Sequence, residues 1–227
     1  MKNLLLLFLS FFVMNLFSQN NNSSNSNGDY NINFSGNPVK AGMWVSSKIE
    51  DKSIIGSPFL FNSWEGFFSV VTKSGNRFDL INLNYNIQTK RLESKISNDS
   101  VFQYDLNVLD FVLVAKKKYK IFNNELFLQL MDNNAFVFLK SYDITIQEAT
   151  NNPLTQSDLT PRRYVIKNEY KILQENTIKE FKLNKKSFFN FFPEKKELIS
   201  KYVNENRLSY SKEEDAITIL YYISNNN

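Results

Sequence analysis

Residues 78–87 read Phe-Asp-Leu-Ile-Asn-Leu-Asn-Tyr-Asn-Ile, and they give the clearest indication of how this chain folds. In an extended chain the apolar residues at 81, 83, 85 and 87 share one face, and the asparagines at 82, 84 and 86 share the other. This period of two predicts a half-buried β-strand whose asparagine face is turned to water. A second apolar run at residues 67–73 precedes it, across Ser74-Gly75-Asn76. Two such runs joined by a short link that contains glycine predict a β-hairpin.

The same alternation recurs along the chain as far as residue 183. It is clear at residues 164–172, after which a turn at 174–176 would lead into a further strand at 177–183. Asparagine and aspartate separate the shorter runs, and both tolerate the left-handed backbone of tight turns. Short links favour sequential antiparallel pairing, so we expect a β-meander, folded as a sandwich or a partly open barrel. The shorter candidate strands are residues 91–97, 101–105, 109–115, 119–122, 126–131, 135–140 and 144–148, and the polar stretch 149–161 is expected to be a surface loop.

The apolar period becomes helical after residue 184. Pro193 suits the first turn of a helix, because its missing N–H is not needed there, and the apolar residues at 198, 199, 202 and 203 then form one stripe. Ser211-Lys212-Glu213-Glu214 has the form of a capping box, which would start a second helix with apolar residues at 216, 219, 220 and 223. A short helical piece at residues 187–192 is expected before both. Strands first and helices last define an α+β fold, with a helical hairpin closing one end of a β domain.

The first eighteen residues are typical of an export signal. Lys2 supplies the positive start, residues 4–17 are almost entirely apolar, and Ser18 is small enough to precede a cleavage site. The apolar run is shorter than the roughly 20 residues of a membrane span, so cleavage is favoured over an anchor. Without a cysteine, a lipoprotein is not expected. We expect residues 1–18 to be a signal peptide, 19–42 a disordered Asn/Ser-rich leader, 43–183 a β-rich domain and 184–224 a helical subdomain packed on it.

The composition excludes several classes of chemistry. The chain has 227 residues, no cysteine, no histidine and a formal net charge of +4. Disulfide scaffolds, thiolate or imidazole metal sites, and mechanisms that need a cysteine nucleophile or a histidine base are ruled out. The small net charge gives no argument for nucleic acid or an anionic membrane as partner. No phosphate-binding glycine loop, calcium loop or nucleophile elbow occurs, so no catalytic, cofactor-binding or metal-ligating residue is assigned and no cofactor is expected.

Several charged groups have a functional reading and a simpler structural one. The lysines at 116–118 and 120 could contact an anionic surface, but charge runs usually lie on solvated turns. Arg162 and Arg163 could clamp an anion, although surface ion pairing is the simpler use. Ser209-Tyr210-Ser211-Lys212 matches the S-x-x-K pattern, but a helix cap explains it. Lysines interleaved with phenylalanine resemble a surface for single-stranded nucleic acid, yet nearby glutamates and export argue against one; these are Lys182, Lys185, Lys186, Lys195 and Lys196.

Two further groups bear on a glycan ligand. Exposed aromatic residues make protein or glycan contact surfaces, although core packing is their commoner fate; the candidates are Trp44, Trp64, Tyr85, Phe59 and Phe61. A glycoside hydrolase needs two carboxylates across one cleft, and the sequence does not tell which acids meet. The scattered acids are Asp79, Glu93, Asp99, Asp105, Asp110, Asp132, Asp143 and Glu148.

Three segments carry a family resemblance. Residues 56–60 read GSPFL, residues 83–87 read LNYNI, and residues 185–223 read KKSFFNFFPEKKELISKYVNENRLSYSKEEDAITILYYI. In order and spacing they resemble a family of exported proteins from Bacteroidota-type bacteria, which have a GSPYL-like start, an LxYNI-like strand and a similar helical tail. The resemblance covers residues 45–223, with Phe59 where tyrosine is usual. It implies an exported, cell-envelope or secreted protein, and it brings no catalytic residues with it.

Two functions from different classes follow. We expect an exported protein, periplasmic, envelope-associated or secreted, that binds or scaffolds without catalysis. Its partner would be an envelope protein or a glycan, with no nucleic acid and, after signal cleavage, no membrane span. The alternative is a carboxylate-dependent hydrolase of cell-wall or dietary glycan. Only the hydrolase needs a pair of acids that face each other across a cleft.

Overall fold

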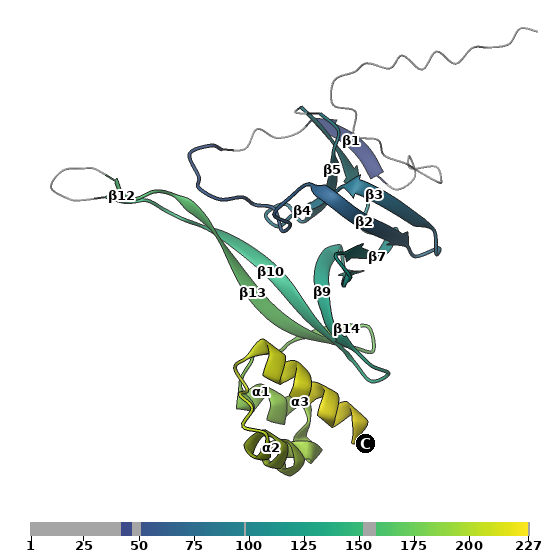
Figure 1. The fold of residues 1–227 in the computed structure, drawn as a ribbon, viewed down its shortest axis with the longest axis vertical. Helices are drawn as coiled ribbons and strands as arrows, with labels where there is room; N and C mark the ends of the chain where they lie inside the picture. Colours follow the sequence, from purple (N-terminus) through teal and green to yellow (C-terminus); the bar gives the residue numbers. More distant parts are fainter. Residues whose placement is uncertain (1–41, 47–50, 98, 152–157, 227) are drawn as a thin grey trace, which may run out of the picture.

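The structure, a computed structural model, describes residues 42–46, 51–97, 99–151 and 158–226. The expected signal peptide, and the expected leader apart from Gly42, lie outside the described residues. Within these ranges the fold is α+β, with antiparallel sheets that end in edge strands and helices that follow all the strands (Figure 1). The predicted fold class is therefore confirmed.

The larger sheet has eight strands in the order β14-β13-β10-β9-β8-β7-β2-β3. Strands β7 to β10 follow one another as in a meander, but β7 pairs with β2, because the chain leaves this sheet after β3 and returns at β7. The strands expected at 135–140 and 144–148 are one long strand, β10, paired with β13 along its whole length as a projecting ribbon (Figure 1). The bounds are β2 Glu65–Thr72, β3 Arg77–Asn82, β7 Leu109–Val114, β8 Lys117–Phe122, β9 Glu125–Asp132, β10 Val137–Gln147, β13 Arg163–Gln174 and β14 Thr177–Glu180.

The smaller sheet has the order β1-β6-β5-β4 and lies at the end of the molecule away from the helices (Figure 1). Its strands are β1 Gly42–Ser46, β4 Asn84–Asn86, β5 Arg91–Lys95 and β6 Ser100–Tyr104. A separate pair, β11 Thr150–Asn151 and β12 Asp158–Thr160, lies at the tip of the ribbon, within the stretch expected to be a loop.

The prediction for residues 78–87 is wrong in one respect. β3 ends at Asn82 and β4 begins at Asn84, so the chain changes sheet within this stretch and the alternation shifts. Both asparagines, predicted to face water, are only 1 % exposed, whereas Ile81, predicted to be buried, is 44 % exposed.

Each of these two buried asparagines links segments that the strand ladders do not join. Asn84 accepts a hydrogen bond from the Phe61 N–H (2.9 Å) and donates one to the Phe61 carbonyl (2.8 Å). Asn82 makes the same two contacts with Lys95, accepting from its N–H at 3.2 Å and donating to its carbonyl oxygen. A side-chain amide has a donor and an acceptor like a peptide group, so it completes the pairing where the strands change sheet.

The helical end comprises α1 Lys185–Phe191, a 3₁₀ turn at Pro193–Lys195, α2 Lys196–Glu205 and α3 Glu213–Asn225. The predicted capping box is wrong: Lys212 is the N-cap of α3 and makes no side-chain cap hydrogen bond. The Ser211 hydroxyl lies 2.9 Å from that of Ser209 instead, and the Asp215 carboxylate accepts from the Ser209 N–H at 2.8 Å. Among the described residues no helix has the length and apolar character needed to cross a membrane.

Two main hydrophobic cores hold these parts together. The first core is formed by residues of both sheets, from Phe68 on β2 to Leu128 on β9. The second core joins the large sheet to the helices: Phe138, Ile172 and Phe181 pack with Phe188 and Ile199. The molecule therefore has a sheet end and a helical end, each with its own core.

Candidate functional site

Three turns at the sheet end surround a cavity of about 370 Å³, which we call the loop cleft. They are the β2–β3, β6–β7 and β8–β9 turns. The residues that line the cleft are Lys73, Leu106, Asn107, Ile121, Phe122, Asn123 and Asn124.

Local sequence explains the shape of each turn. Asn123 and Asn124 both have positive φ (48° and 60°), as a two-residue hairpin turn requires, and asparagine adopts this conformation readily. Asp105 accepts hydrogen bonds from the backbone and side-chain N–H groups of Asn107, at 2.9 and 3.0 Å. The Lys73 N–H donates to the Val108 carbonyl at 2.9 Å, which ties the first turn to the second. The cleft is thus held by backbone contacts between turns.

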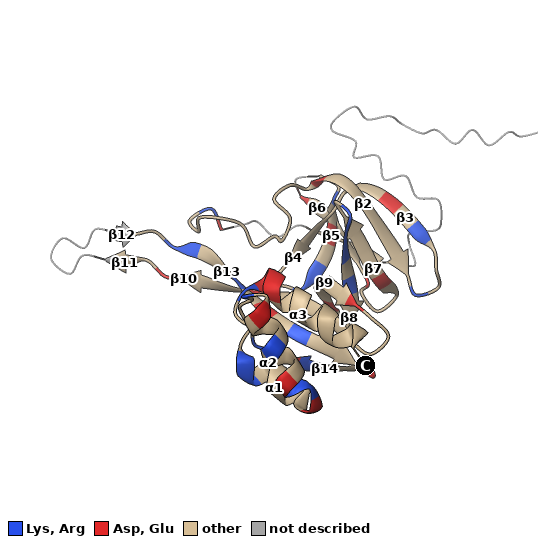
Figure 2. Ribbon diagram, turned by 60° about the horizontal axis from the view of Figure 1, so that its bottom comes forward, with Lys and Arg blue, Asp and Glu red and all other residues tan. Residues whose placement is uncertain are grey.

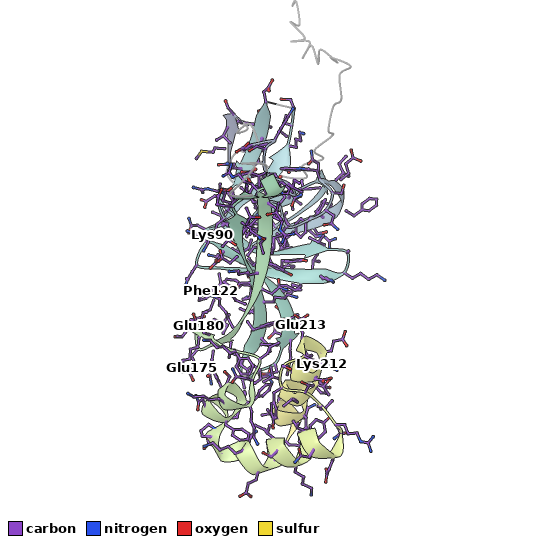
Figure 3. The ribbon with its side chains drawn as sticks, turned by 90° about the vertical axis from the view of Figure 1, so that its left-hand side faces the viewer. Lys90, Phe122, Glu175, Glu180, Lys212 and Glu213 are labelled. Carbon is purple, nitrogen blue, oxygen red and sulfur yellow. The ribbon has the colours of Figure 1, made fainter. Side chains whose placement is uncertain are left out.

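The cleft combines polar side chains with an apolar floor. Leu106 and Ile121 are buried beneath it, and the Phe122 ring is half-buried at its side. Within the described part of the chain, the side chains of Lys73, Asn123 and Asn124 make no hydrogen bond and are exposed. Phe122 lies on the left-hand flank of the molecule in Figure 3, away from Glu213 at the start of α3. The accessible lining of the cleft is therefore mainly polar, with two amides and an ammonium group beside the Phe122 ring.

No carboxylate lines the loop cleft, nor a second cavity of about 210 Å³ between Phe136, Phe192 and Ile223, among the residues described. All the predicted acids except Glu93 are instead spread over the surface, and three of them form ion pairs. Asp79 contacts Arg77 (3.0 Å), Asp110 contacts Lys120 (3.6 Å) and Glu148 contacts Arg162 (2.9 Å). In the described ranges there is likewise no cluster of three potential metal ligands. The geometry offers no acid pair that faces across either cavity.

Glu93 is the one predicted acid that is buried. Burial raises its pKa, and the hydrogen bond from the Gln103 amide (2.8 Å) and the charge of Arg91 only partly oppose this. A single protonatable carboxyl without a second acid does not make a glycosidase site, so its role in this arrangement is structural.

A second polar group lies where the sheet meets α3, and its members bind one another. Lys140 and Tyr170 both contact the same Glu213 oxygen, at 2.8 and 2.7 Å. Burial acts to raise the pKa of Glu213, but the hydrogen bonds from Lys140 and Tyr170 outweigh it and leave the pKa below its usual value. Burial, together with the neighbouring Glu213, raises the pKa of Tyr170 to about 12. At neutral pH Glu213 is therefore ionised and Tyr170 is neutral, and the contacts fasten the helical end to the sheet.

The basic groups singled out in the sequence do not form one surface. Ala115 and Lys116 make the β7–β8 turn, Lys118 lies 4.6 Å from the Phe111 ring centre, and Lys120 faces Asp110. Arg162 forms ion pairs with Glu148 and Asp51, and Arg163 donates to Gln147 at 2.9 Å. Lys195 donates to the carbonyls of Ile223 and Asn226 at the end of α3.

Most of the predicted aromatic residues are packed against other rings. Trp64 lies on Phe59 (4.7 Å between ring centres) and Phe61 lies on Tyr119 (5.3 Å), while burial raises the pKa of Tyr85 to about 12. Trp44 packs edge-on against Phe102 (4.9 Å between ring centres) but is still 57 % exposed.

No functional signal in the sequence singles out the residues of the loop cleft. Asn123 and Asn124 fall between two predicted strands as turn residues, Lys73 and Phe122 fall at the ends of predicted strands, and Asn107 falls between two of them. The signal available was a set of turns rich in asparagine, but their meeting point depends on the sheet order. Comparisons with protein-family models, with curated proteins and with solved structures found no match to this chain.

Proposed function

We propose that this chain is an exported, non-enzymatic binding module that holds a saccharide in the loop cleft. The observation that carries the proposal is the chemistry of the lining, which is mainly polar: the amides of Asn123 and Asn124 and the Lys73 ammonium group, none with a hydrogen-bond partner among the described residues, lie beside the Phe122 ring. Sugars present hydroxyl groups along their edges and C–H groups on their faces. Amide side chains both donate and accept, so they suit hydroxyl groups.

Binding is favoured over hydrolysis because a glycosidase needs an acid and a second carboxylate at the bond it cleaves. The described lining of the cleft contains neither. The export signal and the family resemblance support a place in the periplasm, at the envelope or outside the cell. In that compartment a saccharide is an available ligand.

The test is a screen of the mature chain, starting at residue 19, against neutral and acidic oligosaccharides, followed by calorimetric titration of any that bind. Asn123→Gly/Asn124→Gly removes both amides while keeping the positive φ that glycine tolerates. We expect affinity to fall by about tenfold or more, because each lost hydrogen bond contributes about 1 kcal/mol.

The matched control is Glu175→Gly/Asn176→Gly, which changes the equivalent two-residue turn between β13 and β14, outside the cleft. Its affinity should equal that of the natural chain. Equal weakening in both variants, no binding by any saccharide, or cleavage of the saccharide would contradict the proposal.

A further inference from the structure

The two edge strands of the large sheet are protected to different degrees. β14 is four residues long and exposes Lys179 and Glu180, and short charged edges resist pairing with another chain. β3 is six residues long, contains neither proline nor lysine, and in the described part of the molecule pairs only with β2. Figure 2 shows β3 at the outer margin of the molecule. Among the described residues, no strand other than β2 pairs with β3, so its outer edge is open to another strand.

An apolar pair lies beside this edge. Phe67 on β2 is 90 % exposed, and it falls in the irregular part of the β2–β3 ladder, between Glu65 and Phe68. Ile81 on β3 is opposite this irregular part and is also exposed. Two large exposed apolar side chains therefore lie in the same part of the β2–β3 ladder.

The outward face of β3 also carries two opposite charges in a fixed arrangement. Arg77 and Asp79 are two residues apart, and Arg77 Nε lies 3.0 Å from the Asp79 carboxylate. Ser69 on β2 holds both: it accepts from Arg77 Nη2 at 2.7 Å and donates to Asp79 at 2.5 Å. The two charges therefore occupy defined positions along the edge.

We propose that two copies of this chain pair through β3, antiparallel about a two-fold axis, with Arg77 of each opposite the partner's Asp79. An axis through Phe78 creates this register, and it makes both cross-strand pairs oppositely charged. An axis through Asp79 would place two aspartates directly opposite each other, which is unfavourable. Charge complementarity thus selects one register, and the two large sheets become continuous. In this register Ile81 lies opposite the partner's Gly75, which has no side chain to obstruct it.

The inference does not depend on what the loop cleft binds. It is tested by the mass of the mature chain in solution, measured by sedimentation equilibrium over a range of concentrations. The natural chain should be dimeric. Arg77→Asp alone opposes two aspartates, and Asp79→Arg alone opposes two arginines, so each single variant should shift strongly to monomer.

Two combinations make the test specific to this register. A mixture of the Arg77→Asp and Asp79→Arg chains restores opposite charges in both cross-strand pairs, so heterodimers should form. The double variant Arg77→Asp/Asp79→Arg should dimerise again. Thermal unfolding of every variant checks that the fold is retained. A natural chain that stays monomeric at its highest soluble concentration, or single variants that remain dimeric, would overturn the proposal.

Discussion

The sheet end and the helical end of this molecule differ in whether their polar groups are paired with one another. At the helical end, Lys140, Tyr170 and Glu213 complete one another, and Lys195 donates to the last carbonyls of α3. At the sheet end, the amides of the β8–β9 turn line the loop cleft, and β3 is an edge strand among the residues described. The helices therefore stabilise the chain through paired polar groups, whereas both proposed contact sites, the loop cleft and the β3 edge, lie at the sheet end.

The largest expected effect tests the helical end as a stability element. Phe188 is fully buried in the second core, with its ring 4.9 Å from that of Phe181. Phe188→Ala should lower the free energy of unfolding by about 3–5 kcal/mol, because it leaves a cavity. Phe67→Ala, the matched change at the exposed site, should stay within about 0.5 kcal/mol. Urea unfolding of both variants makes the comparison, and equal losses would contradict it.

The same variants also show whether the two cores unfold separately, if two spectroscopic signals are followed. Both tryptophans, Trp44 and Trp64, lie at the sheet end, while the helical circular dichroism comes from α1 to α3. If the two cores are separately stable, the helical circular dichroism of Phe188→Ala should be lost at a lower urea concentration than the one at which its tryptophan fluorescence changes. Coincident transitions would mean that the two cores unfold as one unit.

A smaller effect is expected at the contact between the two ends. Glu213→Gln removes a partly buried charge from Lys140 and should cost about 1–3 kcal/mol at pH 7. Because the folded pKa of Glu213 lies below its ordinary 4.5, its contribution is present above that value and is lost as the pH falls through the folded pKa. Unfolding measured against pH should therefore bring the natural chain and the variant together in acid. Glu214→Gln, an exposed neighbour, is the control and should change little.

Glu93 at the sheet end should make stability depend on pH in the opposite direction to Glu213. Its folded pKa is raised by burial, so the folded state holds its proton more tightly than the unfolded state. Stability from this group is greatest below the unfolded pKa and falls as the pH rises through the folded pKa. Glu93→Gln should then raise the melting temperature at pH 7 and have little effect near pH 4. A gain at neutral pH that persists unchanged in acid would contradict this assignment.

Local patterns in the sequence predicted much of the fold. The hairpin formed by β2 and β3, the strand β13 and the stripe of α2 all follow from apolar periodicity, and the Asn123-Asn124 turn follows from residue type. The single long β10 could not be predicted, because its polar middle reads as a break unless one knows that this part belongs to a projecting ribbon.

Long-range geometry decides what the sequence did not predict. From the sequence, Asn82 and Asn84 are predicted to face solvent. In the structure they are buried, because the change of sheet between β3 and β4 places backbone groups of Lys95 and Phe61 against them. The loop cleft needs three turns from distant parts of the chain, and their meeting follows from the strand order. Charges along β3 were visible in the sequence, but only the sheet order makes β3 an edge.

The smallest change in stability is expected for two turns of the same kind at opposite ends of β8. Ala115 and Lys116 have φ of 47° and 67°, close to the values of Asn123 and Asn124, yet they lack the residue types that adopt this backbone easily. Ala115→Asn/Lys116→Gly should therefore raise the unfolding free energy by about 0.5–1 kcal/mol. Asn123→Ala should lower the unfolding free energy by a similar amount, because it places alanine at a positive φ in the cleft turn, as Ala115 is in the β7–β8 turn. If both changes leave urea unfolding unaltered, asparagine at the cleft turn is not needed for the fold, and that result would favour the proposed saccharide site as the reason for its amides.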